Sequence, residues 1–121
     1  MKSLRMTGSI VSSFLIVTAT LGAAWTTKKL TAYGAISFVP TVVTSGANVY
    51  VVWHTETSEP SEVFFMRSPD NCANWQPAQR ITNHSGSSQH PTISFNATNI
   101  YVAYDDDTPS LPEIYLKYSP L

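Results

Sequence analysis

The chain repeats itself with a period of 51 residues. When the sequence is shifted against itself by this distance, residues 30–70 align with residues 81–121 without a gap, and eleven of the 41 aligned pairs are identical. A unit of this length cannot bury its own apolar faces and must pack against its neighbours. The period therefore predicts a solenoid, a propeller or a tandem array.

Length and charge narrow the range of functions. The 121 residues allow one domain at most, and charged residues make up only 12% of them. The formal net charge of −1 creates no strong field, so we expect no nucleic-acid partner. A low charge density suits a chain whose faces are largely covered by neighbouring units.

Residues 1–24 have the pattern of a targeting segment. Lys2 and Arg5 give a positive start, an apolar stretch follows from about residue 10, and Gly22-Ala23-Ala24 offers small residues for cleavage. The segment is interpreted as a signal peptide, with an uncleaved signal anchor as the alternative. Only such an anchor would attach the chain to a membrane. Residues 25–121 are expected to be secreted or to lie at the cell surface.

After residue 24 the sequence predicts β-strands and no helix. Segments rich in β-branched and aromatic residues are bounded by Gly, Asn, Pro and Ser, as strands commonly are. Four kinds of strand recur in the two units. They are expected at 28–31 and 79–82, at 40–43 and 91–95, at 48–55 and 99–106, and at 62–68 and 113–119.

The order of these strands predicts an all-β fold of two four-stranded antiparallel propeller blades. Residues 40–82 supply one complete blade. Residues 91–119 supply three strands of the second, and the outer strand at 28–31 would complete it from the other end of the chain. Closed propellers commonly join their ends in this way. The prediction is thus a partial propeller with one blade split between the termini.

A turn motif lies between the third and fourth strands of the complete unit. Residues 68–75 fit the pattern S-x-D-x-G-x-x-W, with Ser68, Asp70 and Trp75 in place and Cys72 at the usual glycine position. On this motif, the strand order and the period, the chain resembles the sialidase-like propellers that carry Asp-box (BNR) repeats. The resemblance covers roughly residues 28–121.

The box residues are interpreted as structural. An aspartate early in a tight turn can accept hydrogen bonds from the turn's own backbone, and the tryptophan can pack its ring against the sheet. Position 72 is expected to need a positive φ, which suits glycine better than cysteine. The second unit ends in Ser119-Pro120-Leu121 and so lacks the aspartate, while Trp25 could supply its tryptophan from the other end.

No catalytic residue is predicted. The resemblance implies a cluster of three arginines, a Tyr–Glu pair and an aspartic acid for an exo-α-sialidase, yet residues 25–121 contain only Arg67 and Arg80. His54 has no fixed partner in the sequence, and no His–Asp pattern supports Cys72 as a nucleophile. The enzyme is therefore the alternative, with its catalytic residues in sequence that this chain lacks.

Asp105, Asp106 and Asp107 are the densest charge in the chain. Clustered carboxylates in a loop can bind Ca²⁺, although consecutive residues tend to point in different directions and a solvated loop is the competing interpretation. No other cofactor is expected. Tyr33, Trp53, Tyr101 and Tyr104 could stack on sugars, but the last three lie on strands that read as core.

Three functions follow. The chain could be an exported, non-catalytic surface or interaction module with Asp-box repeats, and a fragment of a larger propeller. It could bind a glycan as a homo-oligomer, since three copies of two units would close a six-bladed ring. The third function is the sialidase.

Overall fold

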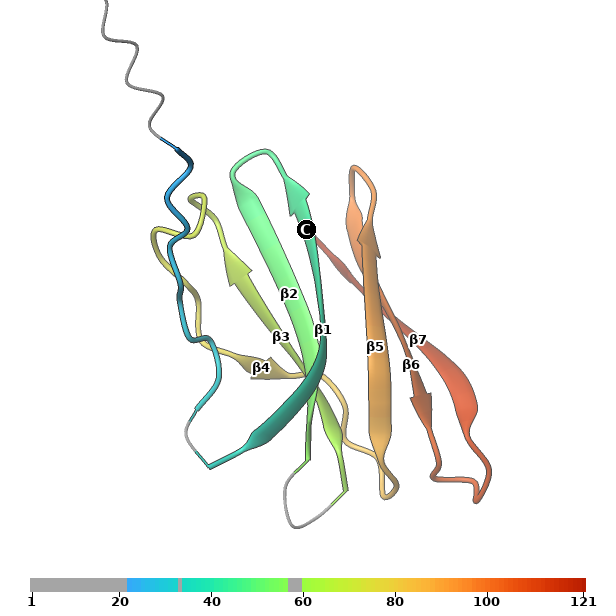
Figure 1. Cartoon of the computed structure of the whole chain (residues 1–121). Coiled ribbons are helices and arrows are strands. Elements are labelled where there is room, and N and C mark those ends of the chain that lie inside the picture. The colour runs from blue at the N-terminus through green and yellow to red at the C-terminus, as the bar shows by residue number, and fades with distance from the viewer. Residues whose placement is uncertain (1–21, 33, 57–59) are drawn as a thin grey trace, which may run out of the picture.

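The computed structural model describes residues 22–32, 34–56 and 60–121, and these form two antiparallel β-sheets. The first sheet has the order β1-β2-β3-β4 and the second the order β5-β6-β7 (Figure 1). The strands are β1 (Ile36–Ser45), β2 (Asn48–Glu56), β3 (Glu62–Ser68), β4 (Gln79–Arg80), β5 (Ser88–Phe95), β6 (Asn99–Asp106) and β7 (Glu113–Pro120). The all-β prediction is confirmed. Neither a closed ring nor a helix occurs in the described part of the chain.

The 51-residue period recurs in the backbone geometry. Tyr50 pairs with Arg67 across β2 and β3, and the residues 51 positions further on, Tyr101 and Tyr118, pair across β6 and β7. Both first strands also change register at the same point of the repeat, between Phe38 and Thr41 in β1 and at the equivalent residues of β5. The two units are therefore the same three-stranded arrangement built twice, and the first carries an additional short strand, β4.

The prolines occupy a different place from the one expected. The strands expected at 40–43 and 91–95 begin with a proline, but Pro40 and Pro91 lie inside β1 and β5, directly after Val39 and His90, which both have a φ of 49°. These positions form β-bulges, and a bulge tolerates a residue without an N–H group. Because the strained backbone recurs in both units, it belongs to the repeated fold.

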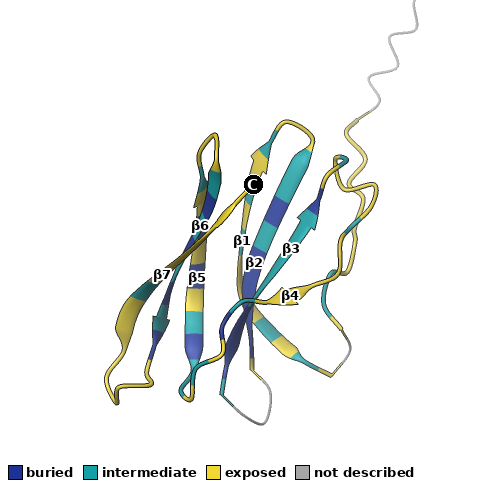
Figure 2. Ribbon diagram, turned by 180° about the vertical axis from the view of Figure 1, so that it is seen from behind, coloured by how far each residue is buried: buried dark blue, intermediate teal, exposed yellow. Residues whose placement is uncertain are grey.

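The core lies between the two sheets. Tyr50, Val52 and Val63 from the first sheet pack against Ile93, Ile100, Val102 and Tyr104 from the second. In Figure 2 the buried positions gather on β2, β5 and β6, whereas β7 is exposed along most of its length. Each sheet thus has an inner face, which contacts the other sheet, and an outer face, which does not.

The split blade is not formed. Residues 28–31 carry no strand, so β7 has no neighbour on its second edge among the described residues. Trp25 is 97% exposed. Residues 22–32 run beside the first sheet, on the side away from the second (Figures 1 and 2). Residues 28–31 and β7, which were expected to share one blade, therefore lie on opposite sides of the pair of sheets.

The expected targeting segment falls mainly outside the described residues, which begin at residue 22. Among the described residues there is no helix of the length and apolar character needed to cross a membrane.

Candidate functional site: the Asp-box turn and the groove between the sheets

The Asp-box turn is held by hydrogen bonds from its own residues. The Asp70 carboxylate accepts the backbone N–H of Asn74 at 2.8 Å and the Asn74 side-chain amide at 2.8 Å. The Ser68 hydroxyl donates to Asp70 Oδ1 at 3.0 Å and accepts the backbone N–H of Cys72 at 2.9 Å. The hydrogen bonds from Asn74 lower the pKa of Asp70. The carboxylate is thereby committed to shaping the turn.

The other two box residues differ in how they fit the turn. Cys72 has a φ of 70°, in the left-handed region that favours glycine, and its thiol is exposed. Trp75 is half-buried, yet its indole Nε1 is buried with no hydrogen-bond partner among the described residues. The unpaired N–H is a cost that the sequence did not indicate.

The three consecutive aspartates turn to three different partners. Asp105 bonds His90 Nδ1 at 2.8 Å, whereas buried Asp106 accepts the Ser88 hydroxyl at 2.6 Å. Asp107 accepts the backbone N–H of Ser87 at 2.6 Å. No group of three metal-ligating side chains is present among the described residues. The geometry thus gives the Ca²⁺ hypothesis no convergent set of oxygens.

A histidine pair links the two sheets near the same end. His54 on β2 is buried, and its Nδ1 accepts the backbone N–H of His90 at 3.4 Å; the two rings lie 5.5 Å apart. Burial, and then the proximity of His90, lowers the pKa of His54. Asp105 orients the exposed His90 ring. No nucleophilic side chain bonds to either imidazole in the described structure, so the pair lacks the geometry of a nucleophilic triad.

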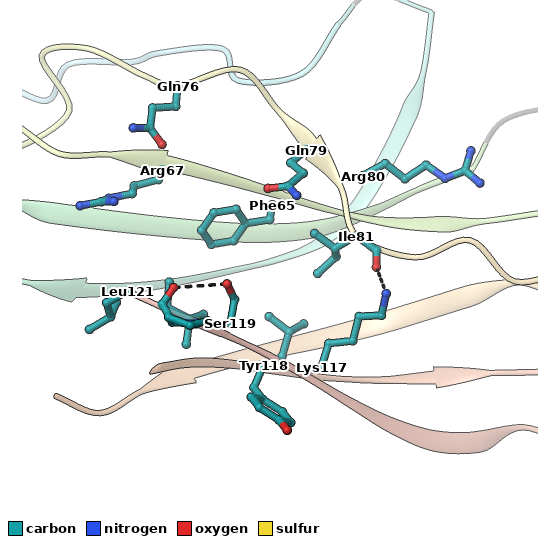
Figure 3. A pocket seen from close by; sticks show the side chains of 13 residues that line it. Phe65, Arg67, Gln76, Gln79, Arg80, Ile81, Lys117, Tyr118, Ser119 and Leu121 are labelled. Atoms are coloured by element: carbon teal, nitrogen blue, oxygen red, sulfur yellow. Dashed lines mark hydrogen bonds between the residues drawn. The ribbon is translucent and has the colours of Figure 1, made fainter. Parts of the chain in front are cut away.

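A groove of about 410 Å³ lies between β3–β4 of the first sheet and β6–β7 of the second (Figure 3). Phe65 lies in its middle, and Gln76 and Gln79 border it on the side of the first sheet. Lys117 borders it from β7. The groove combines an aromatic ring, amide groups and cations, and both repeat units contribute to it.

Arg67 and Lys117, the cations that line the groove, have N–H groups left to donate to a ligand. Arg67 donates to Asn48 Oδ1 through Nε at 3.2 Å and Nη2 at 2.7 Å, and its guanidinium lies 5.6 Å from the centre of the Tyr50 ring. Lys117 Nζ donates to the Ile81 carbonyl at 2.5 Å. These contacts use some of the five donors of arginine and the three of lysine. Both cations are therefore held in place without being saturated.

Arg80 differs from the other two cations. It forms an ion pair with Glu62 at 2.9 Å and donates to the Thr82 carbonyl at 2.8 Å. Glu62 is itself buried and also accepts the Thr82 hydroxyl. In Figure 3 the Arg80 side chain points away from the groove. Since its charge is offset by Glu62, Arg67 and Lys117 carry the positive character of the groove, whose lining includes no carboxylate side chain.

The groove was not predicted from the sequence, although a signal for it is present. Arg67 stands where the second unit has Tyr118, and Lys117 stands where the first has Met66. The two units thus differ at the positions that make the groove cationic. Scaffold positions keep their chemistry instead: Trp53 stacks on Phe64 at 5.9 Å, and the equivalent rings of the second unit also stack at 5.9 Å. Because thirty of the 41 aligned pairs differ, these two differences alone do not single out the groove.

Comparisons with family models, curated proteins and solved structures gave no match. The likeness to Asp-box propellers therefore rests on the residues of the chain itself.

Proposed function

We propose that this chain is an exported, non-catalytic carbohydrate-binding module of the Asp-box type, which binds a sugar carrying a carboxylate in the groove between its sheets. The observation that carries the proposal is that Arg67 and Lys117 both line a groove whose lining includes no carboxylate side chain. A bidentate arginine contact suits a carboxylate. The Gln76 and Gln79 amides suit hydroxyl groups, and Phe65 offers an apolar surface to a sugar ring.

The non-catalytic part of the proposal follows from the chemistry of the groove. The sialidase chemistry that the resemblance implies needs three arginines, a Tyr–Glu pair and an aspartic acid, and the groove lining includes no Asp or Glu side chain. Glu62, which forms an ion pair with the groove residue Arg80, is itself buried. We expect no turnover of a fluorogenic sialoside above the rate without protein. Measurable turnover would overturn the non-catalytic assignment.

Binding is tested by NMR titration of residues 25–121 with 3′-sialyllactose, with lactose as the uncharged comparison. We expect sialyllactose to shift the amide resonances of β3 and β7 residues that line the groove, and lactose to bind at least tenfold more weakly. Arg67→Gln and Lys117→Gln should each weaken sialyllactose binding about tenfold, since a charge-assisted hydrogen bond contributes about 1.5 kcal/mol or more. Higher salt should weaken it further.

The matched control is Lys28→Gln, which removes a positive charge from the exposed segment before β1. It should leave binding unchanged. If lactose binds as tightly as sialyllactose, the carboxylate contributes nothing to binding. If Lys28→Gln weakens binding as much as Arg67→Gln and Lys117→Gln do, the effect comes from net charge alone. The absence of any shift at groove residues would overturn the groove as the site.

Export is a separate part of the proposal and rests on residues 1–24. When residues 1–24 are fused to a reporter enzyme that is active only outside the cytoplasm, we expect reporter activity. Lys2→Glu together with Arg5→Glu should reduce this reporter activity. Mass spectrometry of the exported product would show whether it begins near Trp25, as cleavage requires. Activity that does not depend on the segment would overturn this part.

A further inference from the structure

The outer face of the second sheet carries exposed apolar side chains along β7. Ile114, Leu116 and Tyr118 are 80%, 60% and 71% exposed. Their cross-strand partners are Asp105, Ala103 and Tyr101 on β6. Contiguous apolar surface of this kind is unusual on a protein that works alone and often marks an interaction site.

The 51-residue repeat shows which surface of the first sheet corresponds to the outer face of the second sheet. A shift of 51 residues places Tyr101, Ala103, Ile114 and Leu116 on Tyr50, Val52, Val63 and Phe65. Those four residues form the inner face of the first sheet, which packs against the second sheet in the core. The outer face of the second sheet therefore repeats, in the same register, a surface that the chain already uses for sheet packing.

The complementary surface is also repeated. Ile93, Ile100, Val102 and Tyr104, on the inner face of the second sheet, correspond to Val42, Val49, Val51 and Trp53 on the outer face of the first. Val42 is 59% exposed, and Val49 and Val51 are half-buried. Trp53 is buried, and residues 22–32 run on the same side of the first sheet (Figures 1 and 2), so this outer face is open mainly at the valines.

We propose that the outer face of the β5–β6–β7 sheet binds the outer face of the β1–β4 sheet of a second copy of this chain, head to tail. The contact between copies would repeat the contact that already joins the two sheets within one copy. Such an interface is heterologous, because each copy presents two different faces, and it continues until a ring closes or a filament grows. This inference does not rest on the carbohydrate proposal: the groove lies between the sheets of one copy and shares Tyr118 with this face, but it includes neither Leu116 nor Val42.

Two single substitutions test the arrangement. Leu116→Asp places a charge on the outer face of the second sheet, and Val42→Asp does so on the first. Both side chains are more than half exposed, so each variant should keep the fold, which circular dichroism checks. Leu111→Asp is the matched control, because Leu111 is 74% exposed but lies in the turn before β7, outside both faces.

Sedimentation and light scattering over a hundredfold range of concentration give the outcome. The unchanged protein and Leu111→Asp should increase in mass with concentration, and each face variant alone should stay monomeric. An equimolar mixture of Leu116→Asp and Val42→Asp should form a dimer, because each variant supplies the face that the other has lost. A dimer of either face variant alone, association that survives both substitutions, or an unchanged protein that stays monomeric would overturn the inference.

Discussion

Val63 and Ile114 occupy the same position of the repeat but differ in burial, and substituting each by alanine should give very different losses of stability. Val63 is 0% exposed in the core, whereas Ile114 is 80% exposed on the outer face of β7. Each stands one position into its strand, and each pairs with the strand that precedes it. Because β3 lies between two strands and β7 at the edge of its sheet, strand propensity adds a context-dependent contribution, but its whole scale spans only about 1 kcal/mol.

The expected magnitudes follow from the burial of the two side chains. Val63→Ala removes two buried methyl groups, which costs about 1.6 kcal/mol at about 0.8 kcal/mol each. The cavity left in the core adds roughly 1 kcal/mol, for a total of about 2.5 kcal/mol. Ile114→Ala removes a larger side chain from a site that buries only a small part of it, and burial accounts for about 0.5 kcal/mol.

Urea denaturation measures the loss in free energy of unfolding for both variants. A low micromolar protein concentration keeps association between copies to a minimum. The urea midpoint should fall much further for Val63→Ala than for Ile114→Ala, with little change in the slope m for either variant. At high concentration the loss for Ile114→Ala should grow if a second copy covers this residue. Equal losses at low concentration would refute the assignment of inner and outer faces.

Three further substitutions probe the turns and the histidine pair. Gly86→Ala should destabilise the fold by on the order of 2 kcal/mol in thermal unfolding, because a Cβ there would lie 2.5 Å from the backbone nitrogen of Thr108; a stability equal to that of the unchanged chain would contradict this packing. Cys72→Gly should raise stability by about 0.5 kcal/mol, since relief of the left-handed strain at a φ of 70° exceeds the entropy cost of glycine; a lower melting temperature would show that the thiol matters. The lowered pKa of His54 means that the unfolded chain takes up a proton first as the pH falls below about 6.5, so stability is complete above that pH and declines below it. His54→Gln should remove that decline, and an unchanged pH profile would assign it to other groups.

The sequence was most informative where local chemistry decides the structure. The segments at 62–68 and 99–106 form strands with the predicted bounds, because β-branched and aromatic side chains favour an extended backbone and the 51-residue shift fixes their equivalence. The bulges were missed. A proline was placed at the start of each strand, whereas the positive φ of Val39 and His90 lets the strand begin four and three residues earlier, at Ile36 and Ser88.

The candidate site was less predictable because it depends on contacts between distant segments. Arg67 and Lys117 are 50 residues apart in the sequence and border one groove only because the two sheets pack face to face. The same dependence explains why the consecutive aspartates do not act together. Alternation along β6 turns the Asp105 and Asp106 side chains to opposite sides of the strand, so Asp105 bonds His90 and Asp106 bonds Ser88.

A repeat specifies which positions are equivalent, but it does not specify what each position contacts. Val52 and Ala103 show the difference: the larger residue is fully buried between the sheets, and the smaller one lies on the outer face. Residues 28–31 likewise form no strand, although they are equivalent to 79–82, which contain β4. Equivalence by repeat therefore does not supply the neighbouring strand on which pairing depends. If a second copy packs as we propose, its first sheet covers the outer face of the second sheet in the register that the repeat provides.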